Sequence, residues 1–196
     1  GVTEIKPRTF ENCTSLTSVV ISDTVTRISD RAFYNCSSIN EITIPDSVQA
    51  IGINVFYKTA VLNSQSAAIK YVDNWLVGCD KKLTSAAIKD GTRGIADSSF
   101  INCSSLKTVT MPDSVTYIGA GAFQGCSALT SVTIPKNATT IREATFTDCT
   151  SLKSVTIPDT VTVIEDGAFA RCRKLTSVTI PGSVITIGNG AFHNCN

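Results

Sequence analysis

The sequence predicts an α/β solenoid of repeats about 23 residues long, with a parallel β-sheet on its concave face and short helical segments on its convex face. Three independent residue types share one period along the 196-residue chain. The eight phenylalanines are spaced by 23 residues, except for Phe56 and Phe100, which are 44 apart. A leucine or isoleucine series and five of the six prolines keep the same period. A unit this short cannot bury its own apolar side, so the copies are expected to stack.

Each repeat is expected to contain a short strand that ends at a proline. In residues 129–135, LTSVTIP, the apolar Val132 and Ile134 alternate with polar residues, as in a strand with one buried face. Pro135 has no N–H donor and a fixed φ, so the strand should stop there. Most repeats then place an aspartate that favours a turn: Asp23, Asp46, Asp90, Asp113 and Asp159. This row could hold Ca²⁺, but lysine and glycine interrupt it, so turn capping is predicted and no metal site.

The second half of each repeat is expected to return as a short helix or helical turn. In residues 118–126 the apolar side chains fall at i, i+4, i+5 and i+8, which gives a helix one buried side. The repeated phenylalanine lies on that side. We therefore expect one buried phenyl ring in each layer of the stack.

Residues 57–82 depart from this pattern. Thr59 stands where a cysteine is expected, and Cys79 lies one residue out of register. Alternation over residues 69–77 suggests a strand or hairpin in place of part of a helical return. Tyr71 and Trp75, the only tryptophan, either cover the local core or form a protruding patch that binds a partner, since both residue types are enriched at binding hot spots.

Seven of the eight cysteines follow the repeat and are expected to be free, buried thiols. Their even spacing places one thiol in each layer, which does not gather the four ligands of a metal site. Disulfides need Cα atoms within roughly 7 Å, and the outer layers of a curved stack are expected to lie farther apart. Disulfide pairing therefore remains a less favoured alternative, and Cys79 is the thiol expected to differ from the others.

The residues do not predict an enzyme or a bound cofactor. The single histidine, His193, is expected in an exposed turn, and no nucleophile–base pair or glycine-rich phosphate loop is present. The chain carries 17 Lys and Arg against 16 Asp and Glu, scattered along its length, so nucleic acid is not a predicted partner. No run approaches the roughly 18 apolar residues of a membrane span, and membrane insertion by this segment is not predicted.

The candidate binding surface is the outward face of the predicted strands. With Val132 and Ile134 inward, Ser131 and Thr133 face outward, and polar residues hold most of the same places in other repeats. The further candidates are Glu41, Thr43, Thr108, Thr110, Ser154, Thr156, Ser177 and Thr179. This sheet of hydroxyl groups is either a soluble β face or a broad, weakly charged groove for a protein or glycan.

The repeats LTSVTIP and VTVIEDGAFARC resemble BspA-like leucine-rich repeats of bacterial and protist surface proteins, and the resemblance covers nearly the whole chain. It implies a right-handed leucine-rich repeat horseshoe at the cell surface or outside the cell. The implied role is adhesion or binding to host matrix or cell-surface proteins and glycans. A stretch like NWLVGCD recurs in such proteins, which makes residues 57–82 a variant repeat.

We expect residues 1–196 to form a single, monomeric domain that is an excerpt of a longer protein. A structural spacer that displays another domain is the alternative function.

Overall fold

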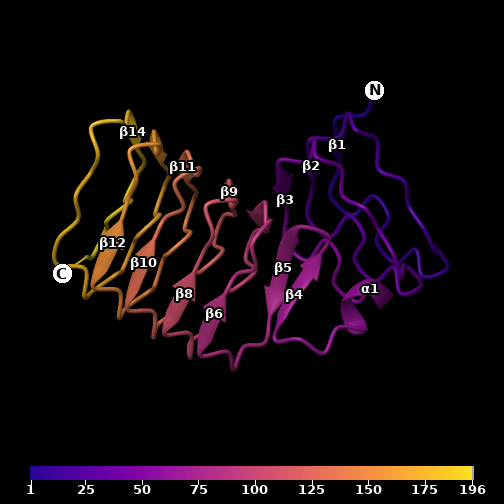
Figure 1. Cartoon of the computed structure of the whole chain (residues 1–196), viewed down its shortest axis with the longest axis horizontal. Coiled ribbons are helices and arrows are strands. Elements are labelled where there is room, and N and C mark those ends of the chain that lie inside the picture. The colour runs from indigo at the N-terminus through magenta and orange to yellow at the C-terminus, as the bar shows by residue number, and fades with distance from the viewer. Residues whose placement is uncertain (196) are drawn as a thin grey trace.

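The chain coils into a solenoid of about eight turns that lie side by side from the N-terminus to the C-terminus (Figure 1). The computed structural model describes residues 1–195. Its turns repeat every 23 residues or so, as the spacing of the phenylalanines predicts. Two ladders of short parallel strands run along the stack.

The first ladder consists of three-residue strands that precede the proline position. They are β6 (Ser85–Ala87), β8 (Thr108–Thr110), β10 (Ser131–Thr133) and β12 (Ser154–Thr156). β6 pairs with β8, and β10 pairs with β12, both in parallel and with partners 23 residues apart. These strands confirm the predicted place of the strand within the repeat and the predicted parallel pairing.

The second ladder consists of two-residue strands at the Val-x-x-Ile part of the repeat. They are β1 (Glu4–Ile5), β2 (Arg27–Ile28), β3 (Ala50–Ile51), β7 (Gly94–Ile95), β9 (Tyr117–Ile118), β11 (Thr140–Ile141), β13 (Val163–Ile164) and β14 (Thr186–Ile187). β1, β2 and β3 form one parallel sheet, and β11, β13 and β14 form another. The isoleucine of each strand faces the interior in most layers.

The prediction of short helical segments is wrong, because the return segments are series of tight turns. In residues 118–126, the N–H groups of Gly121, Phe123 and Gly125 donate to carbonyls of the next layer at 2.8–2.9 Å. The residues between them donate within the layer, as Cys126 does to the carbonyl three residues earlier at 3.1 Å. An α-helix would use the carbonyl four residues earlier. Among residues 1–195 the single α-helix is the four-residue α1 (Ala60–Asn63).

Left-handed backbone conformations explain why these segments cannot be helical. The residue before the repeated cysteine has a positive φ in each regular layer: Asn12, Asn35, Asn102, Gly125, Asp148, Arg171 and Asn194. A right-handed helix requires φ near −60° at every residue, so each such residue ends a turn. Asparagine, aspartate and glycine are the residues that tolerate this conformation best.

The phenylalanines form the centre of the core, as predicted, in two stacks. Rings of Phe10, Phe33 and Phe56 lie 5.2 and 5.9 Å apart, and the five rings from Phe100 to Phe192 lie 4.9–5.4 Å apart. The six inner rings are at most 1% exposed. The interruption falls at the irregular repeat, where the buried apolar residues also divide into two clusters.

The irregular repeat contains an antiparallel hairpin, in agreement with the predicted strand or hairpin over residues 69–77. It is formed by β4 (Ile69–Val72) and β5 (Trp75–Cys79). β5 also pairs in parallel with β7, so that Trp75 lies opposite Gly94. Figure 1 shows the hairpin between β6 and α1, at the junction of the two halves of the stack.

Candidate interaction surface

The predicted hydroxyl groups of β8, β10 and β12 lie on one outward face of the first ladder, and Ser177 and Thr179 are exposed at the same places in the next repeat, where the segment is not a strand. We define the hydroxyl face as nine exposed residues: Ser85, Thr108, Thr110, Ser131, Thr133, Ser154, Thr156, Ser177 and Thr179. Each strand that carries them turns its middle residue inward, as β10 does with Val132, which is 3% exposed. Strand pairing aligns the hydroxyls in rows, with Ser131 opposite Ser154 and Thr133 opposite Thr156. The face therefore presents small polar groups at fixed positions.

Ser85 extends this face by one layer, although sequence reasoning did not select it. Its Oγ lies 2.9 Å from Oγ1 of Thr108, with the threonine hydroxyl as donor. Ser85 precedes Thr108 by 23 residues, so the repeat period could have identified it. Ala87 occupies the second outward place of β6, and the hydroxyl rows therefore end there.

Glu41 and Thr43 are exposed but do not belong to the same paired sheet. Their segment is not a strand, and the N–H of Ile44 donates to a carboxylate oxygen of Asp73 at 3.1 Å. Asp73 is in the turn of the β4–β5 hairpin, which lies between this segment and β6 (Figure 1). The predicted row is thus divided in two by the irregular repeat.

Trp75 covers the local core, and the alternative of a protruding aromatic patch is wrong for this residue. Its side chain is 1% exposed and packs against Gly94, where an added Cβ would lie 2.3 Å from the indole ring. The ring of Tyr117, on β9 and therefore one layer beyond Gly94, lies 5.6 Å from the indole ring. Tyr71 is half-buried, and its hydroxyl accepts the N–H of Lys89 at 3.2 Å. Alternation alone could not tell which face of this strand would be covered by the next layer.

A hollow of about 710 Å³ opens beside the hairpin, on the side of the interrupted phenylalanine stack. Its lining includes the cationic side chains of Arg31, Lys70 and Lys81, together with Tyr57 and Cys79. Sequence reasoning did not identify this hollow. It arises because the hairpin lacks the turn segment that fills the same place in the regular layers.

The regular cysteines contribute to packing and hydrogen bonding between layers. The Sγ atoms of Cys36, Cys126, Cys149, Cys172 and Cys195 each donate to the carbonyl of the phenylalanine 26 residues earlier, at 3.0–3.3 Å. Burial raises the pKa of Cys126 and of Cys172 to about 12, which keeps both as thiols at neutral pH. A thiol in this state is a poor nucleophile.

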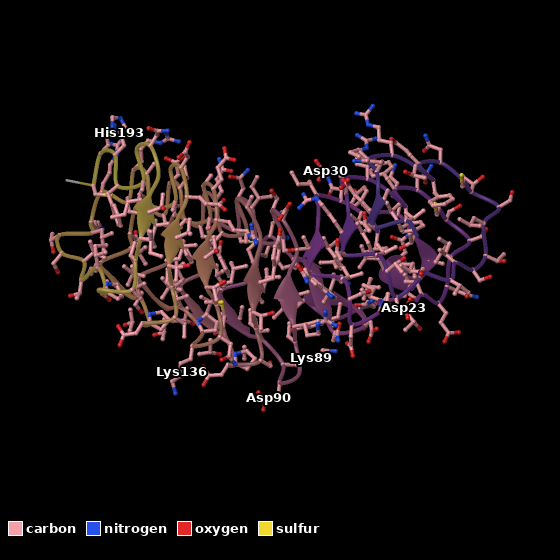
Figure 2. The ribbon with its side chains drawn as sticks, turned by 90° about the horizontal axis from the view of Figure 1, so that it is seen from above. Asp23, Asp30, Lys89, Asp90, Lys136 and His193 are labelled. Carbon is pink, nitrogen blue, oxygen red and sulfur yellow. The ribbon has the colours of Figure 1, made fainter. Side chains whose placement is uncertain are left out.

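The other chemical candidates are dispersed over the surface. Figure 2 shows Asp23, Asp90 and Lys136 along one edge of the stack and His193 at the opposite edge. The thiol of Cys195 donates a hydrogen bond to the backbone carbonyl of Phe169, so it does not pair with His193. Within residues 1–195, no three His, Cys, Asp or Glu side chains come together as metal ligands would. No helix in that range is long and apolar enough to span a membrane.

Comparison with known families gives one match over nearly the whole chain. A family model described as a BspA type leucine rich repeat region, with 6 copies, matches residues 3–76 and 73–196. No curated protein matches the sequence.

Solved structures of bacterial leucine-rich repeat proteins have a similar fold. A leucine rich cell surface protein from Faecalibacterium prausnitzii is 35% identical over 100% of this chain, with a TM-score of 0.64. A leucine-rich repeat protein from Bacteroides ovatus is 28% identical over 99% of the chain, with a TM-score of 0.57. The pneumococcal vaccine antigen PcpA shares the fold at 23% identity and a TM-score of 0.62. The chain spans 55% and 57% of the lengths of the first two.

Proposed function

The chain belongs to the BspA-type leucine-rich repeat family, and we propose that it is a non-enzymatic interaction module that binds a partner through the hydroxyl face. The observation that carries the proposal is the alignment of exposed Ser and Thr side chains on two pairs of parallel strands, β6 with β8 and β10 with β12. A packed stack of layers holds this face rigid before any partner arrives. Little conformational entropy would then be lost on binding.

The chemistry of the face favours a neutral, polar partner surface. Its nine residues carry hydroxyl groups and no charge, so each offers both a donor and an acceptor. Affinity would come from shape and from many hydrogen bonds, because none of these nine residues is charged. Binding should therefore weaken little as salt is added. A protein is the preferred partner, and a glycan would suit the same hydroxyls.

We place the module at the cell surface or outside the cell, as a monomer that adheres to host matrix or cell-surface molecules. Support for the location comes from the family and from the F. prausnitzii neighbour, whose description is a cell surface protein. A structural spacer with no ligand of its own is the competing function. The experiment below separates the two.

The test measures binding of the 196-residue chain to immobilised matrix proteins and to a glycan panel at physiological salt. Thr133→Glu, at the end of β10 and in the middle layer of the hydroxyl face, should weaken binding by about tenfold or more, a loss of roughly 1.4 kcal/mol. Thr139→Glu is the matched control, because Thr139 is an exposed threonine just before β11 and outside the hydroxyl face. Its affinity should stay within about twofold of the wild type.

Raising NaCl from about 0.1 M to about 0.5 M should change the affinity by no more than about threefold. A steep salt dependence, or an equal effect of the two glutamate variants, would contradict binding through the hydroxyl face. Absence of any ligand would instead favour the spacer.

A further inference from the structure

We propose that Cys79 and Cys103 form a disulfide that ties the irregular repeat to the regular repeat that follows it. Cys79 ends β5, and Cys103 lies in the turn segment after Phe100. Their Sγ atoms are 2.7 Å apart. The proposal concerns a covalent modification and does not depend on the proposed function.

The pair arises because Cys103 is the exception among the repeated cysteines that have a preceding layer. The regular thiols donate to a backbone carbonyl 26 residues earlier, as Cys126 does to Phe100 at 3.2 Å. For Cys103 the residue 26 earlier is Val77, which belongs to β5 and not to a turn segment. The sulfur of Cys79, two residues further along β5, takes the place of the carbonyl oxygen. The off-register position of Cys79 thus provides its partner.

Both backbones already hold the two sulfurs in place. Cys79 is paired with Ile69 across the hairpin, and the N–H of Cys103 donates to the carbonyl of Phe100 at 3.0 Å. A disulfide has its sulfurs about 2.05 Å apart, so the two atoms need to approach by only about 0.7 Å. Small side-chain rotations supply such a movement.

The surroundings leave the sulfur of Cys79 accessible to an oxidant and favour the thiolate form of Cys103. Cys79 is half-buried and lines the hollow beside the hairpin, whereas Cys103 is fully buried. The hydrogen bond between the two sulfurs lowers the pKa of Cys103, and the ammonium group of Lys81 acts in the same direction. In the regular ladder, by contrast, burial raises the pKa of the thiols.

The oxidant is a low-molecular-weight disulfide such as glutathione disulfide. After one proton leaves the pair, the remaining proton shifts to Cys103 across the hydrogen bond between the two sulfurs, and the Cys79 thiolate attacks a glutathione sulfur. The first glutathione leaves as its thiolate and takes up the proton of Cys103. The Cys103 thiolate then attacks the Cys79 sulfur of this mixed disulfide and displaces the second glutathione. The two cysteines lose two protons and two electrons in total, and glutathione disulfide becomes two molecules of reduced glutathione.

The test counts free thiols in the 196-residue chain, first after reduction and then after oxidation with glutathione disulfide. Both counts are made in denaturant without reductant, so that buried thiols react. The count should fall from eight in the reduced chain to six, because the pair consumes two. Trypsin cleaves after Lys and Arg, so mass spectrometry should find peptides 71–81 and 94–107 linked through their cysteines. Oxidation should also raise the midpoint of thermal unfolding by roughly 5–10 °C.

Cys79→Ser should keep all seven of its remaining thiols and show no thermal shift on oxidation. The matched control Cys13→Ser removes an exposed thiol and should still lose two of its seven. Eight free thiols in the oxidised wild type, or a linkage between any other pair of peptides, would overturn the proposal. The peptide map of the wild type decides this even where a variant fails to fold.

Discussion

Replacing Phe123 by alanine tests whether the stacked rings are the main stabilising element of the solenoid. Phe123 is 0% exposed, and its ring lies 4.9 Å from Phe100 and 5.4 Å from Phe146. Phe192 occupies the same place in the last layer, but it is half-buried and has one stacked neighbour, Phe169, at 5.2 Å. The chain therefore contains its own control for the same substitution.

The expected costs follow from burial and from the number of neighbours. A buried Phe→Ala change costs about 3–5 kcal/mol, and each aromatic pair contributes roughly 0.5–1.5 kcal/mol beyond its buried area. We expect Phe123→Ala to lower the free energy of unfolding by about 4 kcal/mol. Phe192→Ala should lower the free energy of unfolding by only about 1.5 kcal/mol, because this ring buries less apolar surface and stacks on one ring instead of two.

Urea unfolding, followed by circular dichroism and by Trp75 fluorescence, measures both values. With an m-value of about 2 kcal/mol/M, the midpoint should fall by about 2 M for Phe123→Ala and by about 0.7 M for Phe192→Ala. Equal losses at the two positions, or a loss below about 2 kcal/mol at Phe123, would refute the argument. The stability would then have to come mainly from the hydrogen bonds between layers.

Two further predictions concern close packing and pH. Gly94→Val should lower the free energy of unfolding by about 1–3 kcal/mol and shift the emission of Trp75 to the red, because the new side chain meets the indole ring. Gly182→Ala, where no atom lies within 4 Å of the added Cβ, should change the same free energy by less than about 0.5 kcal/mol, and a similar loss there would contradict this explanation. The guanidinium of Arg171 lowers the pKa of Asp148 through two hydrogen bonds of 2.6 Å, so this pair stabilises the fold above the unfolded pKa of about 3.9 and loses its effect as pH falls through the lower folded value. Because the pair is more than a third exposed, Asp148→Asn should lower the free energy of unfolding in urea by less than about 1 kcal/mol at pH 7. The difference between the variant and the wild type should vanish toward about pH 2. A difference that grows in acid would exclude this ion pair as its cause.

The stacking of the layers could be predicted because it depends on register alone. A strict 23-residue spacing places each phenylalanine above the previous one, whatever backbone conformation joins them. The same holds for the outward hydroxyls, since a strand with Val132 inside must turn Ser131 and Thr133 outward. Both predictions required only the period and the alternation of side chains.

The backbone of the return segments could not be predicted from apolar spacing. Buried residues at i, i+4, i+5 and i+8 fit one side of a helix, and they fit a series of tight turns equally well. The turns form instead of a helix because carbonyls in the next layer, about 22 residues away, accept hydrogen bonds from N–H groups that a helix would pair within itself. The recurrent Asn, Gly or Asp before each cysteine was the available local signal, because these residues favour positive φ.

The irregular repeat joins the two halves of the core through consecutive residues of one strand. Trp75 packs in the N-terminal cluster of buried residues and Leu76 in the C-terminal one, because neighbouring side chains of β5 point to opposite sides. A hairpin can make both contacts, but it supplies no phenylalanine and no turn segment to its layer. The gap in the ring stack, the hollow beside it and the sulfur of Cys79 in place of a backbone carbonyl all follow from that one exchange. The proposed disulfide would join Cys103 to the preceding layer, where a backbone carbonyl accepts the thiol in the regular repeats.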